Sequence, residues 1–191
     1  MQKKQKAKLE QVDTAWTLFL DRDGVINRRL MNDYVKNIQH FEFVEGAVEA
    51  IKRFRNLFYK IIVVTNQQGI GKGLMSEQDL KEIHDYMLTS LKSEGGNINK
   101  IYHCPWLKEN QPFCRKPQIG MALQAKKDFP GIDLKKSIMV GDTLNDMVFG
   151  HRLGMINVLI SEDDQIVKEN PELINYQFES LLQFAKYYTH E

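Results

Sequence analysis

Short apolar runs alternate along the chain with longer segments in which apolar residues recur every three or four positions. A short continuous apolar run is typical of a buried strand of a parallel sheet, and the wider spacing is typical of an amphipathic helix. The pattern predicts strands at 16–20, 61–65, 100–103, 137–141 and 157–160. It predicts helices at 45–58, 76–91, 117–128 and 177–188, and another that follows Asp142 and ends near Gly154.

Individual residues mark where these helices begin and end. Ser76 is a good N-cap, and Asp79 stands three positions later, as in a capping box. Pro117 fits the first position of its helix, where a missing N–H is tolerated. Gly154 fits the position just after a last helical turn.

The alternation of strands and helices predicts an α/β fold. Strands separated by helical segments form parallel sheets with helices on both faces. We therefore expect a Rossmann-like, doubly wound parallel sheet in a three-layer α/β/α arrangement. Since the chain shows no internal repeat and no low-complexity linker, we expect a basic tail at residues 1–12 and a single domain at residues 13–191.

Composition narrows the classes of protein that fit. Of the 191 residues, 42% are hydrophobic and 27% are charged, which is ordinary for a soluble globular protein. The net charge of +1 creates no global field that would attract nucleic acid or an anionic membrane. The chain has neither an apolar run long enough to cross a bilayer nor the pattern of a signal peptide. We expect a cytoplasmic monomer that binds neither nucleic acid nor a membrane.

Two aspartates stand directly after the first predicted strand. Asp21 and Asp23 lie two positions apart, so on an extended backbone their side chains point to the same side. Open α/β sheets bind their ligands at the carboxyl ends of the strands. Neighbouring carboxylates repel each other, and a hard, oxygen-binding cation such as Mg²⁺ relieves the repulsion. The pair therefore predicts a magnesium site.

Polar motifs follow four of the predicted strands. They are the segments 21–24 (DRDG), 64–69 (VTNQQG), 114–117 (CRKP) and 141–146 (GDTLND). Because the carboxyl ends of parallel strands meet at one edge, we expect several carboxylates, a hydroxyl, a lysine and an arginine there. Phosphoryl transfer needs such a set: a nucleophile, a metal held by acids, and donors for the phosphoryl oxygens.

These four motifs, in this order, resemble the haloacid dehalogenase superfamily of aspartate-nucleophile phosphatases. A finer resemblance is to the branch that contains D-glycero-D-manno-heptose 1,7-bisphosphate phosphatase and histidinol-phosphate phosphatase. The segments that carry it are FLDRDGVIN, Tyr34-Val35 before FEFVEG, VVTNQQGIGKG, IYHCP, CRKP and MVGDTLNDM. In this superfamily, aspartate at position 23 is typical of phosphatases, whereas transport ATPases carry threonine. The resemblance implies a Mg²⁺-dependent phosphatase.

For the acids, the resemblance implies separate roles. Asp21 attacks phosphorus and forms an aspartyl-phosphate. Asp23 protonates the leaving oxygen and then deprotonates the hydrolytic water. Asp142, the Asp21 carboxylate and the Asp23 backbone carbonyl hold Mg²⁺. Asp146, four positions after Asp142, supports either Lys116 or the metal.

By the same resemblance, other groups bind the substrate. Thr65 and the amide region of Asn66 bind phosphoryl oxygens. Lys116 neutralises developing charge and restrains Asp21, and Arg115 recognises the substrate. No chemical role is expected for His84, a structural or surface residue within a predicted helix.

The intervals between the motifs leave no room for a large cap domain. A loop and one helix fill the interval from Asp23 to Thr65, and a loop, one helix and a strand fill the interval from Thr65 to Lys116. Specificity must then come from the loops 28–34, 67–74 and 104–115. Arg28 and Arg29 either meet a second anionic group on the substrate, together with Arg115, or are plain surface residues. The glycine-rich GIGKG segment lacks the spacing of a P-loop, so a flexible turn is expected there.

The cysteines depart from the family pattern. Cys104 and Cys114 match two of the four ligands of a structural zinc loop in heptose-bisphosphate phosphatases, and Trp106 and Pro112 stand at the other positions. Structural zinc normally needs four protein ligands, so we do not expect zinc. We expect instead a loop packed on Trp106 and Phe113. A disulfide between the cysteines is disfavoured because the cytoplasm is reducing.

The resemblance favours one small phosphorylated sugar as substrate. FEFVEG, IYHCP and CRKP occur together as in the heptose enzymes, which implies removal of the 7-phosphate from heptose 1,7-bisphosphate for lipopolysaccharide precursors. Three alternatives stay open: a histidinol-phosphate phosphatase, a nucleic-acid 3′-phosphatase and a non-catalytic phosphosugar-binding protein. Near-neutral charge argues against the nucleic-acid enzyme, and the complete set of site residues argues against a non-catalytic protein.

Overall fold

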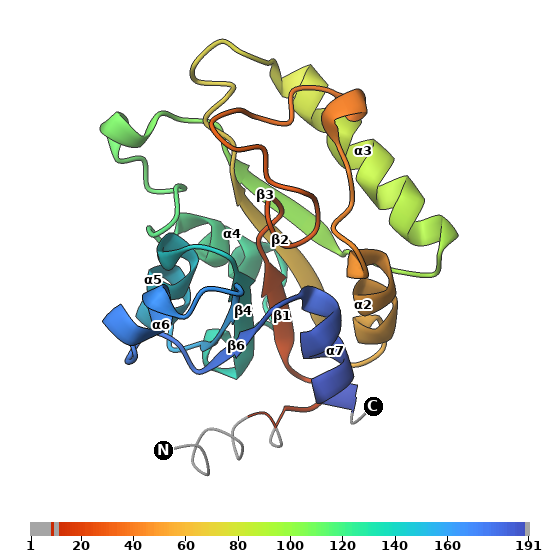
Figure 1. The fold of residues 1–191 in the computed structure, drawn as a ribbon, viewed down its shortest axis with the longest axis vertical. Helices are drawn as coiled ribbons and strands as arrows, with labels where there is room; N and C mark the ends of the chain where they lie inside the picture. The colour runs from red at the N-terminus through yellow and green to blue at the C-terminus, as the bar shows by residue number, and fades with distance from the viewer. Residues whose placement is uncertain (1–8, 10–11, 190–191) are drawn as a thin grey trace.

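The computed structural model describes residue 9 and residues 12–189, so most of the predicted basic tail lies outside the described residues. In this part of the chain, six strands form one parallel sheet with the order β3-β2-β1-β4-β5-β6 (Figure 1). The strands are β1 (Thr17–Leu20), β2 (Lys60–Asn66), β3 (Lys100–Cys104), β4 (Ser137–Gly141), β5 (Ile156–Ile160) and β6 (Tyr176–Phe178). The predicted Rossmann-like α/β fold is confirmed.

Helices cover both faces of the sheet, as Figure 1 shows. One face packs against α2 (Ala47–Phe54), α3 (Glu77–Ser93) and α7 (Leu181–Thr189). The other face packs against α4 (Gly120–Asp128) and α5 (Leu144–Arg152), with the short α6 (Gln165–Glu169) beyond β5. Short 3-10 turns lie at Ile38–His40, Lys108–Asn110 and Leu134–Lys136. Among the described residues, no helix combines the length and the apolar character needed to span a membrane.

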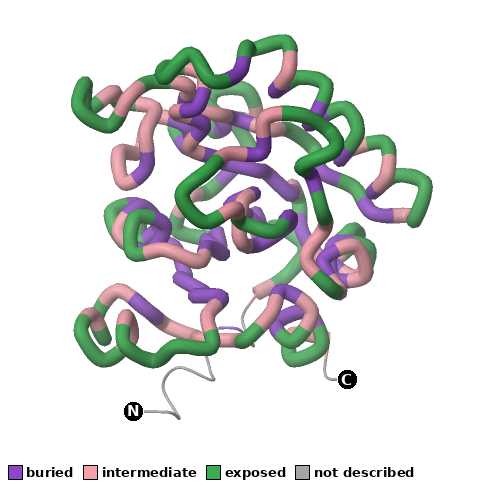
Figure 2. Tube along the Cα trace, turned by 45° about the horizontal axis from the view of Figure 1, so that its top comes forward, coloured by how far each residue is buried: buried purple, intermediate pink, exposed green. Residues whose placement is uncertain are grey.

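The central strand explains why an uninterrupted apolar run is needed. Leu18 and Leu20 of β1 point into the core beneath α2, α3 and α7, whereas Phe19 points into the core beneath α4 and α5. Since both faces are covered, every residue of β1 is buried, and alternation with polar residues would place charge in a core. Figure 2 shows the buried strands enclosed by exposed loops.

The topology creates a crevice at one point of the sheet edge. The chain builds β1, β2 and β3 toward one side and then returns to place β4 on the other side of β1. Ligands bind at such a switch point, outside the carboxyl ends of the strands. Asp21 follows β1, and its N–H donates to the carbonyl of Val140 in β4 at 2.9 Å. Asp142 follows β4, so the two acids flank the crevice.

Two of the predicted helix ends are confirmed and one is wrong. Ser76 and Asp79 form a capping box at the start of α3, and Gly154 follows α5 with φ of +70°. The helix predicted from Pro117 begins at Gly120 instead. The N–H of Gln118 donates to the carbonyl of Arg115 at 2.7 Å, which closes a turn and delays the first helical residue.

The predicted closing helix at 177–188 is also wrong in its first part. Tyr176–Phe178 forms the edge strand β6, which pairs with Val158, Leu159 and Ile160 of β5. Helix α7 begins only at Leu181. The pairing partner is supplied by tertiary structure, so periodicity along the chain does not indicate this three-residue strand.

Phe184→Ala should lower the free energy of unfolding by about 3–5 kcal/mol, because it empties a large buried site. Phe184 is fully buried in α7 and contacts Phe54 of α2, with ring centroids 5.3 Å apart. Urea denaturation followed by circular dichroism measures the loss. Lys186→Ala on the exposed face of α7 is the control and should stay within about 0.5 kcal/mol of the wild type.

Candidate active site

Side chains from separate strand ends surround one cavity of about 560 Å³ above β1. Eight of the residues singled out from the sequence line it: Asp21, Asp23, Arg29, Thr65, Asn66, Arg115, Lys116 and Asp146. Asp142 reaches this group through an ion pair with Arg29. Arg28 lies apart, because its guanidinium faces Glu42 at 3.4 Å and both side chains are largely exposed.

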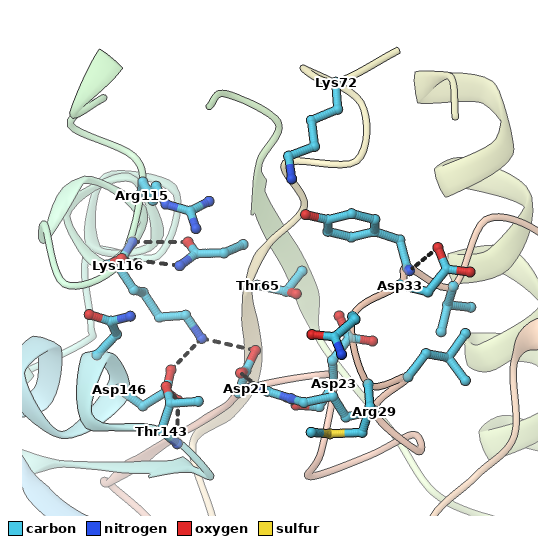
Figure 3. A pocket seen from close by; sticks show the side chains of 17 residues that line it. Asp21, Asp23, Arg29, Asp33, Thr65, Lys72, Arg115, Lys116, Thr143 and Asp146 are labelled. Carbon is cyan, nitrogen blue, oxygen red and sulfur yellow. Dashed lines mark hydrogen bonds and ion pairs between the residues drawn. The ribbon is translucent and has the colours of Figure 1, made fainter. Parts of the chain in front are cut away.

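Lys116 is a buried ammonium held between two carboxylates. Its Nζ lies 2.9 Å from Oδ1 of Asp21 and 2.6 Å from Oδ1 of Asp146, as Figure 3 shows. Burial lowers the pKa of Lys116, but the charges of Asp146 and Asp21 outweigh it and raise that pKa overall. Of the two roles considered for Asp146, this geometry fits support of Lys116. Burial raises the pKa of Asp21 to about 6, against the opposing effect of Lys116.

The backbone that carries Lys116 is held by Asn66. The Asn66 amide donates from Nδ2 to the Lys116 carbonyl at 3.1 Å, and its Oδ1 accepts from the Lys116 N–H at 3.0 Å. The Asn66 side chain is therefore engaged with protein backbone across the end of β2. This clamp joins the motif after β2 to the motif that follows Cys114, and it places Lys116 toward Asp21.

Asp23 is an ionised carboxylate surrounded by donors. Arg22 donates from Nη2 to both of its oxygens at 2.9 and 3.0 Å, Asn27 donates at 2.9 Å and Gln67 at 2.8 Å. Burial raises the pKa of Asp23, but the charge of Arg22 and these hydrogen bonds together hold it below its usual value. Gln67 also donates to Oγ1 of Thr65 at 2.8 Å, so it links the two motifs.

Three oxygens form a site for a cation: Oδ2 of Asp21, the carbonyl oxygen of Asp23 and Oδ1 of Asp142. Nη2 of Arg29 lies 2.7 Å from Oδ1 of Asp142, 3.0 Å from the Asp23 carbonyl oxygen and 3.8 Å from Oδ2 of Asp21. These are the groups that the family resemblance assigns to Mg²⁺. Burial and the charge of Asp21 raise the pKa of Asp142 to about 8, against the opposing charge of Arg29.

The chemistry of this donor set fits Mg²⁺, which prefers carboxylate and carbonyl oxygens. One ligand atom each of Asp21, Asp142 and Asp146 lies within 4.8 Å of the others. The Asp142 carboxylate packs so closely on the Gly24 backbone that a Cβ on Gly24 would lie 2.0 Å from Oδ2 of Asp142. Gly24 also has φ of +91°, so two independent constraints demand glycine there.

A second basic region lies across the cavity from Asp21. Figure 3 shows Arg115 and Lys72 extending toward the cavity from its rim. Nη1 of Arg115 is buried and has no hydrogen-bond partner among the described residues, so it is a donor available to a ligand. Nζ of Lys72 lies 5.4 Å from the ring centroid of Tyr34. Lys72 was not among the predicted site residues. It belongs to the GIGKG segment, and the position of this segment directly after the VTNQQ motif could have indicated that Lys72 lines the site.

The loop between β3 and the Arg115-Lys116 pair differs from expectation. Cys104 and Cys114 form a disulfide, the alternative that the expected reducing cytoplasm disfavoured. Cys104 ends β3, and the loop that follows returns Cys114 to its side, so the two Cα atoms lie 5.4 Å apart. This distance is within the usual range for a disulfide. Trp106 and Phe113 are both more than half exposed, so the expected packing on these rings is wrong.

Comparisons with known proteins give a consistent result. The family model described as Polynucleotide kinase 3 phosphatase matches residues 17–174. A Mycobacterium bovis protein named D-glycero-alpha-D-manno-heptose-1,7-bisphosphate 7-phosphatase is 42% identical over 144 residues, 75% of this chain and 76% of the relative. A Pasteurella multocida protein named D-glycero-beta-D-manno-heptose-1,7-bisphosphate 7-phosphatase is 36% identical over 176 residues, 88% of this chain and 94% of the relative.

A solved structure extends the likeness to nearly the whole chain. The crystal structure of D,D-heptose 1,7-bisphosphate phosphatase from B. bronchiseptica, complexed with magnesium and phosphate, matches with a TM-score of 0.82 at 27% identity. The match covers 92% of this chain and 98% of that one.

The parallel sheet, the buried aspartate–lysine pair and the acidic cation site together define a phosphoryl-transfer enzyme of the α/β class. The chain belongs to the haloacid dehalogenase superfamily of phosphatases, in the family of the heptose-bisphosphate phosphatases that it matches. The resemblance to this superfamily and the predicted class of enzyme, a phosphatase, are therefore confirmed.

Mg²⁺ should raise the melting temperature of the wild type by roughly 5–10 °C at about a hundredfold excess over its Kd, because it binds only the folded cluster. Asp142→Asn removes a charged ligand and should abolish most of this increment. Differential scanning calorimetry with and without Mg²⁺ measures it. Glu162→Gln, an exposed acid elsewhere, should keep the full increment; equal increments in both variants would contradict the assignment.

Arg29→Ala should tighten Mg²⁺ binding by about two- to five-fold. The guanidinium contacts the same three oxygens, so a divalent cation must displace an ion pair worth up to about 1 kcal/mol. Isothermal titration calorimetry of the metal alone measures the change. Arg55→Ala, an exposed arginine on another surface, should leave the affinity unaltered; weaker binding in Arg29→Ala would show that Arg29 does not compete.

Proposed function

We propose that the protein removes the 7-phosphate from D-glycero-D-manno-heptose 1,7-bisphosphate through an aspartyl-phosphate on Asp21, with Mg²⁺ as cofactor. Relatives named as heptose-1,7-bisphosphate 7-phosphatases share 33–45% identity with this chain, which supports this substrate. The enzyme would supply the heptose monophosphate for nucleotide-activated heptose.

One observation carries the chemistry. Asp21 is a buried carboxylate with an ammonium 2.9 Å from Oδ1 and an acidic cation site on its Oδ2 side, and it faces an open cavity. Positive charge on both sides lets an anionic phosphate approach a carboxylate, which mutual repulsion would otherwise prevent. Mg²⁺ held by Asp21, Asp142 and the Asp23 carbonyl would supply this charge screening and polarise a phosphoryl oxygen.

In the first step, a carboxylate oxygen of Asp21 forms a bond to phosphorus while the bond from phosphorus to the sugar oxygen breaks. Asp23, in its protonated form, gives its proton to that departing oxygen. Thr65 and Lys116 offer donors to the phosphoryl oxygens, whose charge increases during the transfer. The products of this step are the dephosphorylated alcohol and a phosphoryl group on Asp21.

In the second step, water attacks the phosphorus of the aspartyl-phosphate. Asp23 is now a carboxylate and accepts a proton from the water as the new bond forms. The Asp21–phosphorus bond breaks, which restores the Asp21 carboxylate and releases inorganic phosphate. The charge of Arg22 and the hydrogen bonds that hold the pKa of Asp23 below its usual value keep it ionised in the resting protein, the form that accepts this proton.

The far side of the cavity supports a bisphosphate. Arg115 has a buried guanidinium nitrogen without a partner, and Lys72 stands on the same rim. Cations that line the same cavity as Asp21 suit a second phosphate on the same small sugar. Arg28 lies outside the cavity, so Arg115 and Lys72 are the better candidates for this contact.

Asp21→Asn should reduce phosphate release by about 10³-fold or more, because the amide cannot act as the nucleophile. Phosphate release from heptose 1,7-bisphosphate with Mg²⁺ measures this loss. Activity that persists in Asp21→Asn would rule out the covalent route.

Arg115→Ala should raise the KM for the bisphosphate by roughly tenfold or more, the cost of one charged hydrogen bond, with little change for a monophosphorylated sugar. Arg55→Ala is the matched control and should leave both values unaltered. An equal rise for both sugars would place Arg115 at the reacting phosphate instead.

The match to a 3′-phosphatase family model favours one competing function, action on nucleic-acid ends. The assay should therefore compare heptose 1,7-bisphosphate, histidinol phosphate and a 3′-phosphorylated oligonucleotide under identical conditions. We expect kcat/KM for the heptose to exceed the others by at least about 100-fold. Preference for the oligonucleotide would replace the proposed substrate while leaving the chemistry of Asp21 intact.

A further inference from the structure

Arg22, between the two aspartates of the DRDG motif, is a completely buried arginine. Its side chain has no solvent exposure, whereas 24% of the Asp23 side chain is exposed. The Arg22 carbonyl accepts from the N–H groups of Ile26 and Asn27 at 2.8 and 3.1 Å, so the backbone beneath the side chain is anchored by a tight turn. A buried guanidinium must find acceptors for its donors, since an unpaired one is costly to bury.

The guanidinium of Arg22 has partners on two sides. Its Nε and Nη2 point at Asp23, with the closest contacts at 2.9 and 3.0 Å. Its remaining nitrogen, Nη1, lies 3.2 Å from Nε2 of His84, which is buried in α3. Because a planar guanidinium turns as one unit, the contact at Nη1 also fixes the direction of the two donors at Asp23.

His84 is an acceptor in this contact. Burial lowers the pKa of His84 to about 3, and the neighbouring charges of Arg22 and His103 act in the same direction. The ring is therefore neutral at physiological pH, and a neutral imidazole has one nitrogen that accepts. Helix α3 thus reaches the Asp23 carboxylate through two side chains, His84 and Arg22.

We propose that His84 is a positioning residue for Asp23 and acts through Arg22. This inference rests on the proposed function, in which Asp23 protonates the leaving oxygen. Without an acceptor at position 84, the Nη1 donors of Arg22 are buried and unpaired, so the guanidinium rotates or moves to regain a partner. Asp23 then loses the bidentate contact that sets its orientation toward the leaving group.

Leaving groups of different basicity separate this role from a general structural one. A sugar alkoxide is a poor leaving group and needs the proton from Asp23, whereas 4-nitrophenolate leaves without one. Hydrolysis of the aspartyl-phosphate, in which Asp23 acts as a base, is common to both substrates and does not enter kcat/KM. A misplaced Asp23 therefore lowers kcat/KM for heptose bisphosphate far more than kcat/KM for 4-nitrophenyl phosphate. A loosened fold or a damaged nucleophile slows both substrates by the same factor.

The experiment measures kcat and KM for both substrates in the Mg²⁺-loaded enzyme. His84→Leu and His84→Met remove the acceptor, and His84→Gln restores one through Oε1. Asp23→Asn sets the selectivity expected when the acid is lost, and His151→Leu, an exposed histidine on α5, is the matched control. Thermal denaturation of each variant establishes that it is folded, and the two apolar variants guard against the failure of either one.

We expect His84→Leu and His84→Met to lower kcat/KM for the sugar substrate about tenfold or more beyond any loss of kcat/KM on 4-nitrophenyl phosphate. KM should stay unaltered, and His84→Gln should recover most of the rate. Suppose that Asp23→Asn slows the sugar substrate more than 4-nitrophenyl phosphate. Equal losses on the two substrates in His84→Leu and His84→Met, or no loss at all, would then overturn the inference. If Asp23→Asn is itself unselective, the acid role in the proposed function fails and the inference falls with it.

Discussion

The active site depends on one buried ammonium, Lys116, held between the carboxylates of Asp21 and Asp146. All three side chains are at least 92% buried, and each would be expensive to bury alone. Asp21 follows β1, Lys116 follows the loop after β3, and Asp146 lies in the first turn of α5. The ammonium can offset the charge of both carboxylates only when the strand order brings these segments to the switch point, so the site is assembled by the topology of the sheet.

Neighbouring contacts serve this charge cluster and local structure at once. Oδ2 of Asp146 accepts from the N–H of Thr143 at 3.1 Å and completes the capping box of α5, while Oδ1 faces Lys116. A Cβ on Gly141 would lie 2.2 Å from the Cβ of Asp146, so only glycine lets the helix start this close to β4. The start of α5 is therefore defined by the same residue that supports the lysine.

Much of this arrangement could be predicted because its signals are local. A buried strand is a short apolar run, and the polar motif that ends it stands at the next position, as Leu20 and Asp21 illustrate. Parallel topology then brings the motifs together without knowledge of any side-chain contact. The strand Tyr176–Phe178 escaped because it depends on a partner strand that folding brings near from elsewhere in the chain. The Cys104–Cys114 bond was disfavoured because its redox environment was weighed and the distance between the cysteines, which the fold sets, was not known.

The side-chain network around Asp23 lay beyond prediction for a related reason. His84 reads as an ordinary helical residue, and only the direction in which α3 crosses the sheet turns it toward Arg22. Likewise, the placement of Arg29 among three oxygens depends on the path of a loop, which hydrophobic periodicity does not describe. Strand ends indicate which chemistry is present, whereas packing between elements decides how each group is held.

The surroundings of the two aspartates of the DRDG motif shift their pKa values in opposite directions. Burial raises the pKa of Asp21 to about 6, whereas Arg22 and its companion donors outweigh burial and lower that of Asp23. In the proposed mechanism, attack on phosphorus needs an ionised Asp21 and a protonated Asp23, so Asp23 is the residue whose resting state must change. A divalent cation among the three oxygens favours the charged form of Asp21, and a phosphate dianion beside Asp23 favours its neutral form. In the proposed mechanism, the metal therefore serves Asp21 by stabilising its carboxylate, and the bound substrate serves Asp23 by favouring the proton that the first step transfers.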